Sequence, residues 1–377
     1  MKNLFLILTV LFCFDVKAQI TTENIESTFL RKVRTIDLYV PEADSELIDP
    51  MPLIVVLEGN DLFNLTVSNV KFLSKIGYMP KSIVVGIRQE GSAQVKRDSE
   101  INKNSGQLSS RGSNFKQFII SDIVQRLQSQ YNISKLKVIL GKNKLGNFIN
   151  FFLLDNNPIF SAYIAITPEL TGSIIDPIIA KTTTVKKDIS YYLSNSENLP
   201  KRQKNNTYIF SDELKKVENS KFHLTNDVLA DPDEFSSPMY SIPVALENIF
   251  RVYQPISPKV YKEKILKENQ PPHVFLINKY QRIYRELGIQ KKYILNDVMA
   301  VFAAAQKKAD AESLFVLGEL ALQDYPTTMM GYYFNGLGYE ILENYKKALK
   351  NYESAYTLEP IDFITKELVL NKIELLK

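Results

Sequence analysis

The sequence predicts an α/β protein with a mostly parallel central sheet, followed by an all-α C-terminal region. Two observations carry this prediction. Short apolar segments, typical of buried parallel strands, alternate with longer amphipathic segments over the first two thirds of the chain. A stretch punctuated by prolines comes next, and beyond it the pattern is helical to the end. The length of 377 residues allows about two domains, and 45% hydrophobic residues supply a sizeable core.

The first 18 residues have the composition of a secretory signal peptide. Lys2 precedes an apolar run over residues 4–14 that is too short to span a bilayer comfortably, and Ala18 fits a cleavage site. Cys13, the only cysteine, lies in this segment, and Phe12 before it is not the small residue that lipoprotein processing prefers. We therefore expect an exported protein, periplasmic or extracellular, whose mature chain has no disulfide and no transmembrane segment.

A domain with alternating strands and helices is expected over residues 19–252. Its buried-type strands are expected at residues 52–57, 82–87, 136–140 and 162–166. An amphipathic helix that ends near Tyr131 precedes the third of these strands, and a helix-like run over residues 148–154 follows it. Strands that alternate with helices in this way favour a parallel sheet.

The segment from Val138 to Asn147 has the pattern of a nucleophile elbow without its serine. In such an elbow an apolar strand enters a sharp Gly-x-Ser-x-Gly turn that leads into a helix. Here Gly141 opens the turn, Asn143 takes the place of the nucleophile and Leu145 takes that of the second glycine. Asparagine tolerates the positive φ of the elbow, whereas the bulk of Leu145 favours a relaxed turn.

Other segments complete the pattern in a fixed order. They are Leu57-Glu58-Gly59, Val85-Gly86-Ile87, Phe115-Lys116-Gln117-Phe118-Ile119 and Ile166-Thr167-Pro168-Glu169-Leu170. In this order and spacing, residues 25 to 250 resemble the enterochelin-esterase-like branch of the α/β-hydrolases. The resemblance implies an α/β-hydrolase sandwich and a Ser–acid–His triad.

The resemblance also shows which parts of the triad are degenerate. Asn143 stands for the nucleophile, Glu197 is in the place of the acid, and Phe235 is in the place of the histidine. An asparagine amide cannot attack an ester at neutral pH, and phenylalanine cannot accept a proton. Loss of a nucleophile or base lowers turnover about a millionfold in a serine protease. We therefore expect a pseudo-esterase that binds a ligand or partner without hydrolysis.

A binding site is expected to survive at the elbow. The resemblance implies backbone donors at Gly59 or Asn60 for a carbonyl oxygen, beside the amide of Lys144. Lys142 and Lys144 flank Asn143, in a spacing typical of a solvated turn; alternatively they attract an anionic ligand. The expected ligand is a small-molecule ester or an anion, with neither a metal nor a cofactor.

The main alternative is an active serine esterase with a displaced triad, acting on carbohydrate, siderophore or acyl esters. It requires His223 as the base, in a helix-to-strand connection, because His273 in the proline-rich linker is the only other histidine. It also requires a serine ahead of the elbow, from the set Ser105, Ser109, Ser110 and Ser113. A hydroxyl within hydrogen-bond reach of either histidine would favour this alternative.

The C-terminal region is expected to be helical over residues 273–377, after a linker over 253–272 with a short charged helix. One segment matches the spacing of a tetratricopeptide repeat, at Tyr332, Gly336, Tyr339, Ala348, Tyr352, Ala355 and Pro360. A last helix is expected over residues 361–376. Such a region binds a protein partner as a scaffold, or only packs on the first domain. A formal net charge of +4, evenly mixed, argues against nucleic acid.

Overall fold

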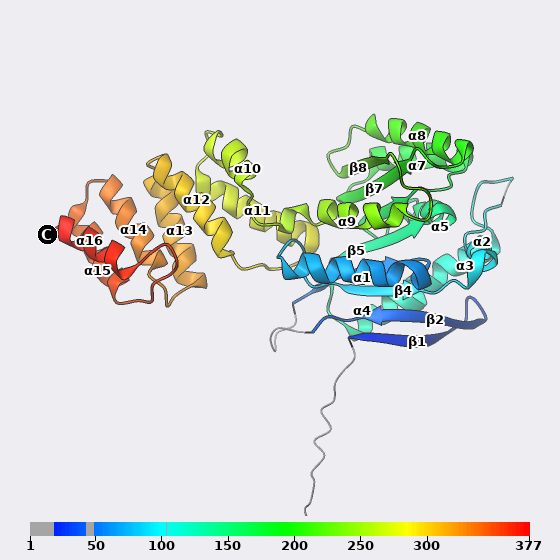
Figure 1. Cartoon of the computed structure of the whole chain (residues 1–377), viewed down its shortest axis with the longest axis horizontal. Coiled ribbons are helices and arrows are strands. Elements are labelled where there is room, and N and C mark those ends of the chain that lie inside the picture. The colour runs from blue at the N-terminus through cyan, green and yellow to red at the C-terminus, as the bar shows by residue number, and fades with distance from the viewer. Residues whose placement is uncertain (1–18, 43–48, 103) are drawn as a thin grey trace, which may run out of the picture.

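The structure, a computed structural model, describes residues 19–42, 49–102 and 104–377 (Figure 1). The predicted signal peptide lies outside the described residues. The strands are β1 (Ile20–Ser27), β2 (Lys32–Tyr39), β3 (Met51–Val56), β4 (Ile83–Ile87), β5 (Ile133–Lys142), β6 (Ala162–Ile166), β7 (Ile189–Ser196) and β8 (Phe222–Leu229). They form one sheet in the order β1-β2-β4-β3-β5-β6-β7-β8.

The sheet is parallel from β4 to β8, and only β1 and β2 run antiparallel to their neighbours. This confirms the predicted mostly parallel sheet. The central strands β3 to β6 are almost wholly buried, because helices cover both faces. The carboxyl ends of β3, β5, β6 and β7 meet at one edge of the sheet, which we call the carboxyl edge. The opposite one is the amino edge.

Helices cover both faces of the sheet. α1 (Gly59–Lys75) and α9 (Ser237–Ile249) contact each other on one face and share a core with β3, β5 and β6. The other face is covered by α3 (Ser110–Phe118), the π-helix η1 (Ile119–Gln125), α4 (Arg126–Gln130), α5 (Asn143–Phe148), α6 (Asn150–Leu153), α7 (Gly172–Thr184) and α8 (Lys201–Lys215). α2 (Gly91–Asp98) follows β4 and contacts α3 and α5. The arrangement is the predicted sandwich.

The C-terminal region is all helical, as predicted. Its elements are η2 (Arg251–Tyr253), α10 (Pro258–Val260), the π-helix η3 (Tyr261–Leu266), α11 (Pro272–Leu287), α12 (Leu295–Lys307), α13 (Ala311–Asp324), α14 (Met330–Ile341), α15 (Tyr345–Tyr356) and α16 (Lys366–Leu375). α13 to α16 pack one against the next. Gly336 lets α14 approach α15, since a Cβ there would lie 2.4 Å from a ring carbon of Tyr352.

The helical region joins the sheet at the amino edge, far from the elbow (Figure 1). α11 contacts the start of β5, where Gly288 lies against Lys135. Leu276, Ile283 and Leu287 of α11 belong to the same buried cluster as the residues under α1 and α9. The two parts of the chain therefore share one apolar core.

Several boundaries differ from the sequence prediction. The helix after the elbow begins at Asn143 rather than at Phe148, because the turn itself is the first turn of α5. His223 lies within β8, not in a connection before a strand. The last helix begins at Lys366, because an isolated bridge joins Ile361 to Ile364. None of the helices in the described ranges has the length and apolar character to cross a bilayer.

Candidate functional site

The turn after β5 has the geometry of a tight elbow. β5 ends at Lys142 and α5 begins at once with Asn143, whose φ is +49°. Gly141 is required here, since a Cβ would lie 2.6 Å from the carbonyl oxygen of Leu145. The prediction that the bulk of Leu145 relaxes the turn is wrong. The Leu145 side chain is fully buried in the core beneath the elbow, in the cluster that contains Phe148. The bulk therefore points away from the turn.

The side chain of Asn143 is held by two neutral partners. Its Oδ1 accepts hydrogen bonds of 3.2 Å from Thr167 Oγ1 and from Gln203 Nε2. Gln203 Nε2 also donates to the carbonyl oxygen of Thr167, at 2.6 Å. Thr167 is fully buried and follows β6 with a φ of +39°, while Gln203 reaches the site from α8. Two unusual backbone conformations at one edge of a sheet are typical of a functional site.

Buried hydroxyls continue this network along the carboxyl edge. The backbone N–H of Thr167 donates to the carbonyl oxygen of Ser194, at the end of β7, at 3.1 Å. Ser241 Oγ, on α9, donates to Ser194 Oγ at 3.0 Å. Both serines are fully buried. Tyr192 bonds both serines and donates to Asp227 Oδ2 at 3.0 Å. No histidine bonds these hydroxyls within the described residues, so the network lacks the imidazole that activates a serine in a hydrolase triad.

Lys142 is buried rather than solvated, which corrects the expectation for this residue. It is 8% exposed, and its Nζ lies 3.8 Å from Glu58 Oε1 and 3.5 Å from Asp61 Oδ2. Glu58 is the last residue before α1 and has a φ of +52°. Burial raises the pKa of its carboxyl to about 7, against the opposing effect of Lys142. The lysine charge at the elbow is therefore shared with two acidic groups.

The loop after β3 is fastened to the loop after β4. The backbone N–H of Glu58 donates to Gln89 Oε1 at 2.6 Å, and the side chain of Asn60 bonds the backbone of Gln89 in both directions. Gly59 packs against β4 so closely that a Cβ would lie 2.7 Å from the carbonyl carbon of Gly86. The side chain of Asn60 is thus occupied, whereas Glu58 Oε2 and Gln89 Nε2 are buried without a hydrogen-bond partner among the described residues.

Lys144 forms an ion pair with Glu169, and both side chains are about half exposed. The backbone N–H of Glu169 in turn donates to the carbonyl oxygen of Asn143 at 2.9 Å. Together with the Thr167 hydrogen bond, these two contacts tie the loop after β6 to the elbow. Both lysines beside Asn143 have carboxylate partners, which weakens the case for an anion at the elbow.

Glu197 and Phe235 both follow strands that end at the carboxyl edge. Glu197 accepts a hydrogen bond from Tyr208 Oη and lies 3.3 Å from Lys204 Nζ. The Tyr208 hydrogen bond, followed by that of Lys204, lowers the pKa of the Glu197 carboxyl. Phe235 is 75% exposed in the loop before α9. The acid is thus engaged by a tyrosine and a lysine, not by a histidine.

His223 lies too far from the elbow to act as its base. The strand registers place it level with Ser190, Ala162 and Val138, near the amino edge. Asn143 is therefore about 16 Å further along the strand direction and about 14 Å across the sheet. His223 Nε2 lies 3.3 Å from Asp188 Oδ1, a carboxylate that also pairs with Lys221. This geometry argues against His223 as the base that the active-esterase alternative requires.

His273 does contact a serine, but the contact joins two helices of the C-terminal region. His273 Nδ1 lies 2.9 Å from Ser313 Oγ, and Ser313 Oγ donates to Asp310 Oδ2 at 2.7 Å. Because the serine proton is committed to Asp310, the imidazole must be the donor to Ser313 Oγ. Asp310 also caps α13, and Ser313 is fully buried. The arrangement fastens α11 to α13 and does not activate a nucleophile.

Among the described residues, the serines ahead of the elbow have no histidine partner. Ser109 caps α3 and donates to Glu100 Oε2 at 2.6 Å. In the described ranges, neither histidine bonds any of the four serines that the active-esterase alternative requires. The same ranges contain no group of His, Cys, Asp and Glu side chains that could hold a metal ion.

Sequence reasoning missed the partners of Asn143 and Lys142. Thr167 carried a signal, because a polar residue directly after a buried strand lies at the carboxyl edge. Gln203 carried none, since it is 60 residues from Asn143 on a helix with an unremarkable polar face. Glu58 had its place in the family pattern, but its contact with Lys142 depends on β3 and β5 being neighbours.

Comparisons with solved structures identify the fold. The structure is similar to an uncharacterised protein from Capnocytophaga ochracea, with 28% identity and a TM-score of 0.85 over 95% of this chain and 99% of that one. It is also similar to an IroE-like serine hydrolase from Shewanella oneidensis, with 18% identity and a TM-score of 0.60 over 81% and 99%. A third match, BES protein from Bacillus cereus, has 18% identity and a TM-score of 0.55 over 62% and 96%.

No protein-family model matches the chain, and no curated protein sequence is similar to it. The Capnocytophaga match covers nearly the whole of both chains, so the α/β part and the helical region occur together in that protein too. The first part of this chain has an α/β-hydrolase-like fold, and an all-helical region follows it.

Proposed function

We propose that this protein is an exported pseudo-esterase, which binds a small ester at its elbow without hydrolysing it. The observation that carries the proposal is the bonding of Asn143. The elbow keeps its positive φ, and the residue in the nucleophile's position is an amide held by Thr167 and Gln203. A tight elbow with a neutral, hydrogen-bonded side chain supports binding, and the missing base argues against chemistry.

An ester is favoured over an anion as the ligand at this edge. Lys142 is shared between Glu58 and Asp61, and Lys144 is paired with Glu169. The carboxylates of Asp61 and Glu169 would repel a second negative charge. A neutral ester carbonyl needs only a backbone donor, for which Gly59, Asn60 and Lys144 remain our candidates. Ester binding also agrees with the serine-hydrolase name of the Shewanella neighbour.

We assign the helical region a supporting role. Leu276 and Ile283 of α11 are fully buried in the core that lies under α1 and α9. A region that shares its core with the sheet domain stabilises that domain directly. Its likeness to tetratricopeptide repeats and a protein partner for it stay proposals, as does export through the segment 1–18.

Turnover and binding of 4-nitrophenyl butyrate test the proposed function together. We expect the wild-type protein to bind the ester, measured by ligand-observed NMR at pH 6, and to release nitrophenol no faster than buffer does. Asn143→Ala should leave this release unchanged. Saturable hydrolysis by the wild type that Asn143→Ala lowers would contradict the proposal, as would an absence of binding.

A further inference from the structure

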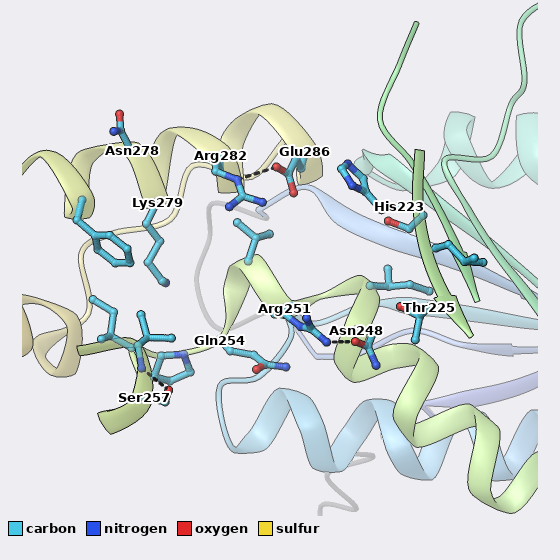
Figure 2. A pocket seen from close by; sticks show the side chains of 18 of the residues that line it. His223, Thr225, Asn248, Arg251, Gln254, Ser257, Asn278, Lys279, Arg282 and Glu286 are labelled. Carbon is cyan, nitrogen blue, oxygen red and sulfur yellow. Dashed lines mark hydrogen bonds and ion pairs between the residues drawn. The ribbon is translucent and has the colours of Figure 1, made fainter. Parts of the chain in front are cut away.

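A cavity of about 490 Å³ lies between the amino edge of the sheet and the helical region. Its walls come from β8, the end of α9, η2, the segment up to Val260, and α11 (Figure 2). We call it the junction cavity. It lies at the end of the sheet opposite to Asn143, so it is separate from the elbow. Ligand sites commonly have volumes of about 300–1,000 Å³ and lie where two parts of a protein meet.

Positive charge exceeds negative charge in the lining. Arg251 bonds only Asn248 and has no carboxylate partner in the described part of the chain. Arg282 pairs with Glu286 at 3.0 Å, but Glu286 also pairs with Arg285 at 3.3 Å. One carboxylate therefore serves two guanidinium groups.

Lys279, the remaining lysine or arginine in the lining of the junction cavity, has a carboxylate partner. Lys279 Nζ lies 2.8 Å from the buried Asp297 Oδ2. Asp188 serves His223 and Lys221, each at 3.3 Å. Among the described residues that line the cavity, Arg251 is therefore the arginine or lysine without a carboxylate partner. Arg282 shares its carboxylate partner, Glu286, with Arg285. Arg251 lies on η2 and Arg282 on α11, two elements that face each other across the junction cavity (Figure 2).

The rest of the lining combines amides with apolar side chains. Gln254 uses only its Nε2, towards Glu247, within the described residues. Asn278 is exposed, and its side chain points away from the other labelled side chains (Figure 2). The apolar part of the wall consists of Leu224, Ile249, Val252, Ile256, Val260 and Phe275. Polar and apolar groups therefore share the wall about equally, so it offers hydrogen-bonding groups that can orient a ligand and apolar side chains that can contact its body.

We propose that the junction cavity binds a small organic carboxylate with an apolar body, its charge held by Arg251 and Arg282. Guanidinium is the side chain best suited to a carboxylate, because it donates two parallel hydrogen bonds. A single uncompensated guanidinium matches the one charge of a carboxylate, whereas a phosphate monoester carries nearly two at neutral pH. The apolar side chains in the wall favour an apolar body for the ligand.

The test uses 4-(trifluoromethyl)benzoate as the probe and ¹⁹F NMR titration of the full chain as the readout. 4-(Trifluoromethyl)benzamide has the same shape without the charge, and phenyl phosphate competes as the alternative anion. We expect the wild type to bind the benzoate at least tenfold more tightly than the benzamide, with weaker competition by phenyl phosphate. Arg251→Gln should weaken benzoate binding at least tenfold, because a charge-assisted hydrogen bond is lost.

Arg111→Gln is the matched control, because Arg111 is an exposed arginine on α3 outside the junction cavity. It should leave benzoate binding unchanged, and thermal melts should show that both variants are folded. Benzoate binding that is absent from the wild type, equal to that of the benzamide, or unchanged in Arg251→Gln would overturn the proposal. Tighter binding of phenyl phosphate would overturn the choice of a carboxylate. None of these outcomes depends on the elbow.

Discussion

Asn143 and Thr167 are joined by a side-chain hydrogen bond of 3.2 Å, and both have a positive φ. Each residue directly follows a parallel strand, β5 or β6, at the carboxyl edge. In an active hydrolase the nucleophile at the position of Asn143 would face its base. Here the amide oxygen of Asn143 accepts a hydrogen bond from Thr167 and takes no proton from it, so the contact is structural.

The first prediction separates the two roles of Asn143. Asn143→Gly removes the hydrogen bonds to Thr167 and Gln203 but keeps the positive φ, at a cost of about 1–2 kcal/mol in the free energy of unfolding. Asn143→Ala also adds left-handed strain, for about 1 kcal/mol more. Urea denaturation of both variants measures the difference. Equal stability of the two would show that the turn is relaxed in solution.

The second prediction concerns how tightly the backbone of the elbow turn packs around Gly141. Gly141→Ala places a Cβ 2.6 Å from the carbonyl oxygen of Leu145, a backbone atom that cannot move alone. We expect a loss of about 2–3 kcal/mol in urea denaturation.

Gly172→Ala is the matched control for this change. Gly172 is the first residue of α7, and a Cβ there would meet nothing within 4 Å. The control should be neutral or slightly stabilising. Equal effects of the two substitutions would mean that the turn is wider than the structure shows.

The third prediction concerns Glu58, whose pKa is about 7 in the folded protein against an ordinary value of 4.5. Between these two values the folded state binds more protons than the unfolded state. The free energy of unfolding therefore falls as pH rises from about 4.5 to 7, by at most about 3 kcal/mol. Glu58→Gln removes this dependence, so its stability relative to the wild type should rise by about 1–3 kcal/mol between pH 5 and pH 8.

Urea denaturation at pH 5, 6, 7 and 8 measures this change. Lys142 keeps Asp61 as a partner in Glu58→Gln, which limits the damage from the lost ion pair. Glu247→Gln, at an exposed position on α9, controls for the change to an amide itself. A constant difference between Glu58→Gln and the wild type at all four pH values would show that the Glu58 carboxyl is hydrated.

The strand pattern, the elbow glycine and the positive φ at Asn143 could be predicted from the sequence. Each depends on local chemistry: a buried strand is apolar, and asparagine tolerates a left-handed backbone. The direction of the Leu145 side chain could not be predicted. Whether that residue widens the turn depends on the space beneath it, which Phe148 and its neighbours define.

Contacts between residues far apart in the chain also could not be predicted from the sequence. Lys142 and Asp61 are 81 positions apart, and only the adjacency of β3 and β5 brings them together. A lysine in a turn is usually solvated, so its burial could not be expected. His223 shows the same limit, since its distance from the elbow follows from its position near the start of β8.

The central claim is that the wild-type protein has no activated serine. Intact-mass measurement after treatment with a fluorophosphonate tests it most directly, beside the double variant Asn143→Ser, Phe235→His. We expect no mass change for the wild type, because Asn143 cannot be phosphonylated. We expect one adduct on the double variant, which places a serine and a histidine at the positions that the family resemblance implies for the nucleophile and the base. A stoichiometric adduct on the wild type would contradict the account, and peptide mapping would then identify the serine that carries it.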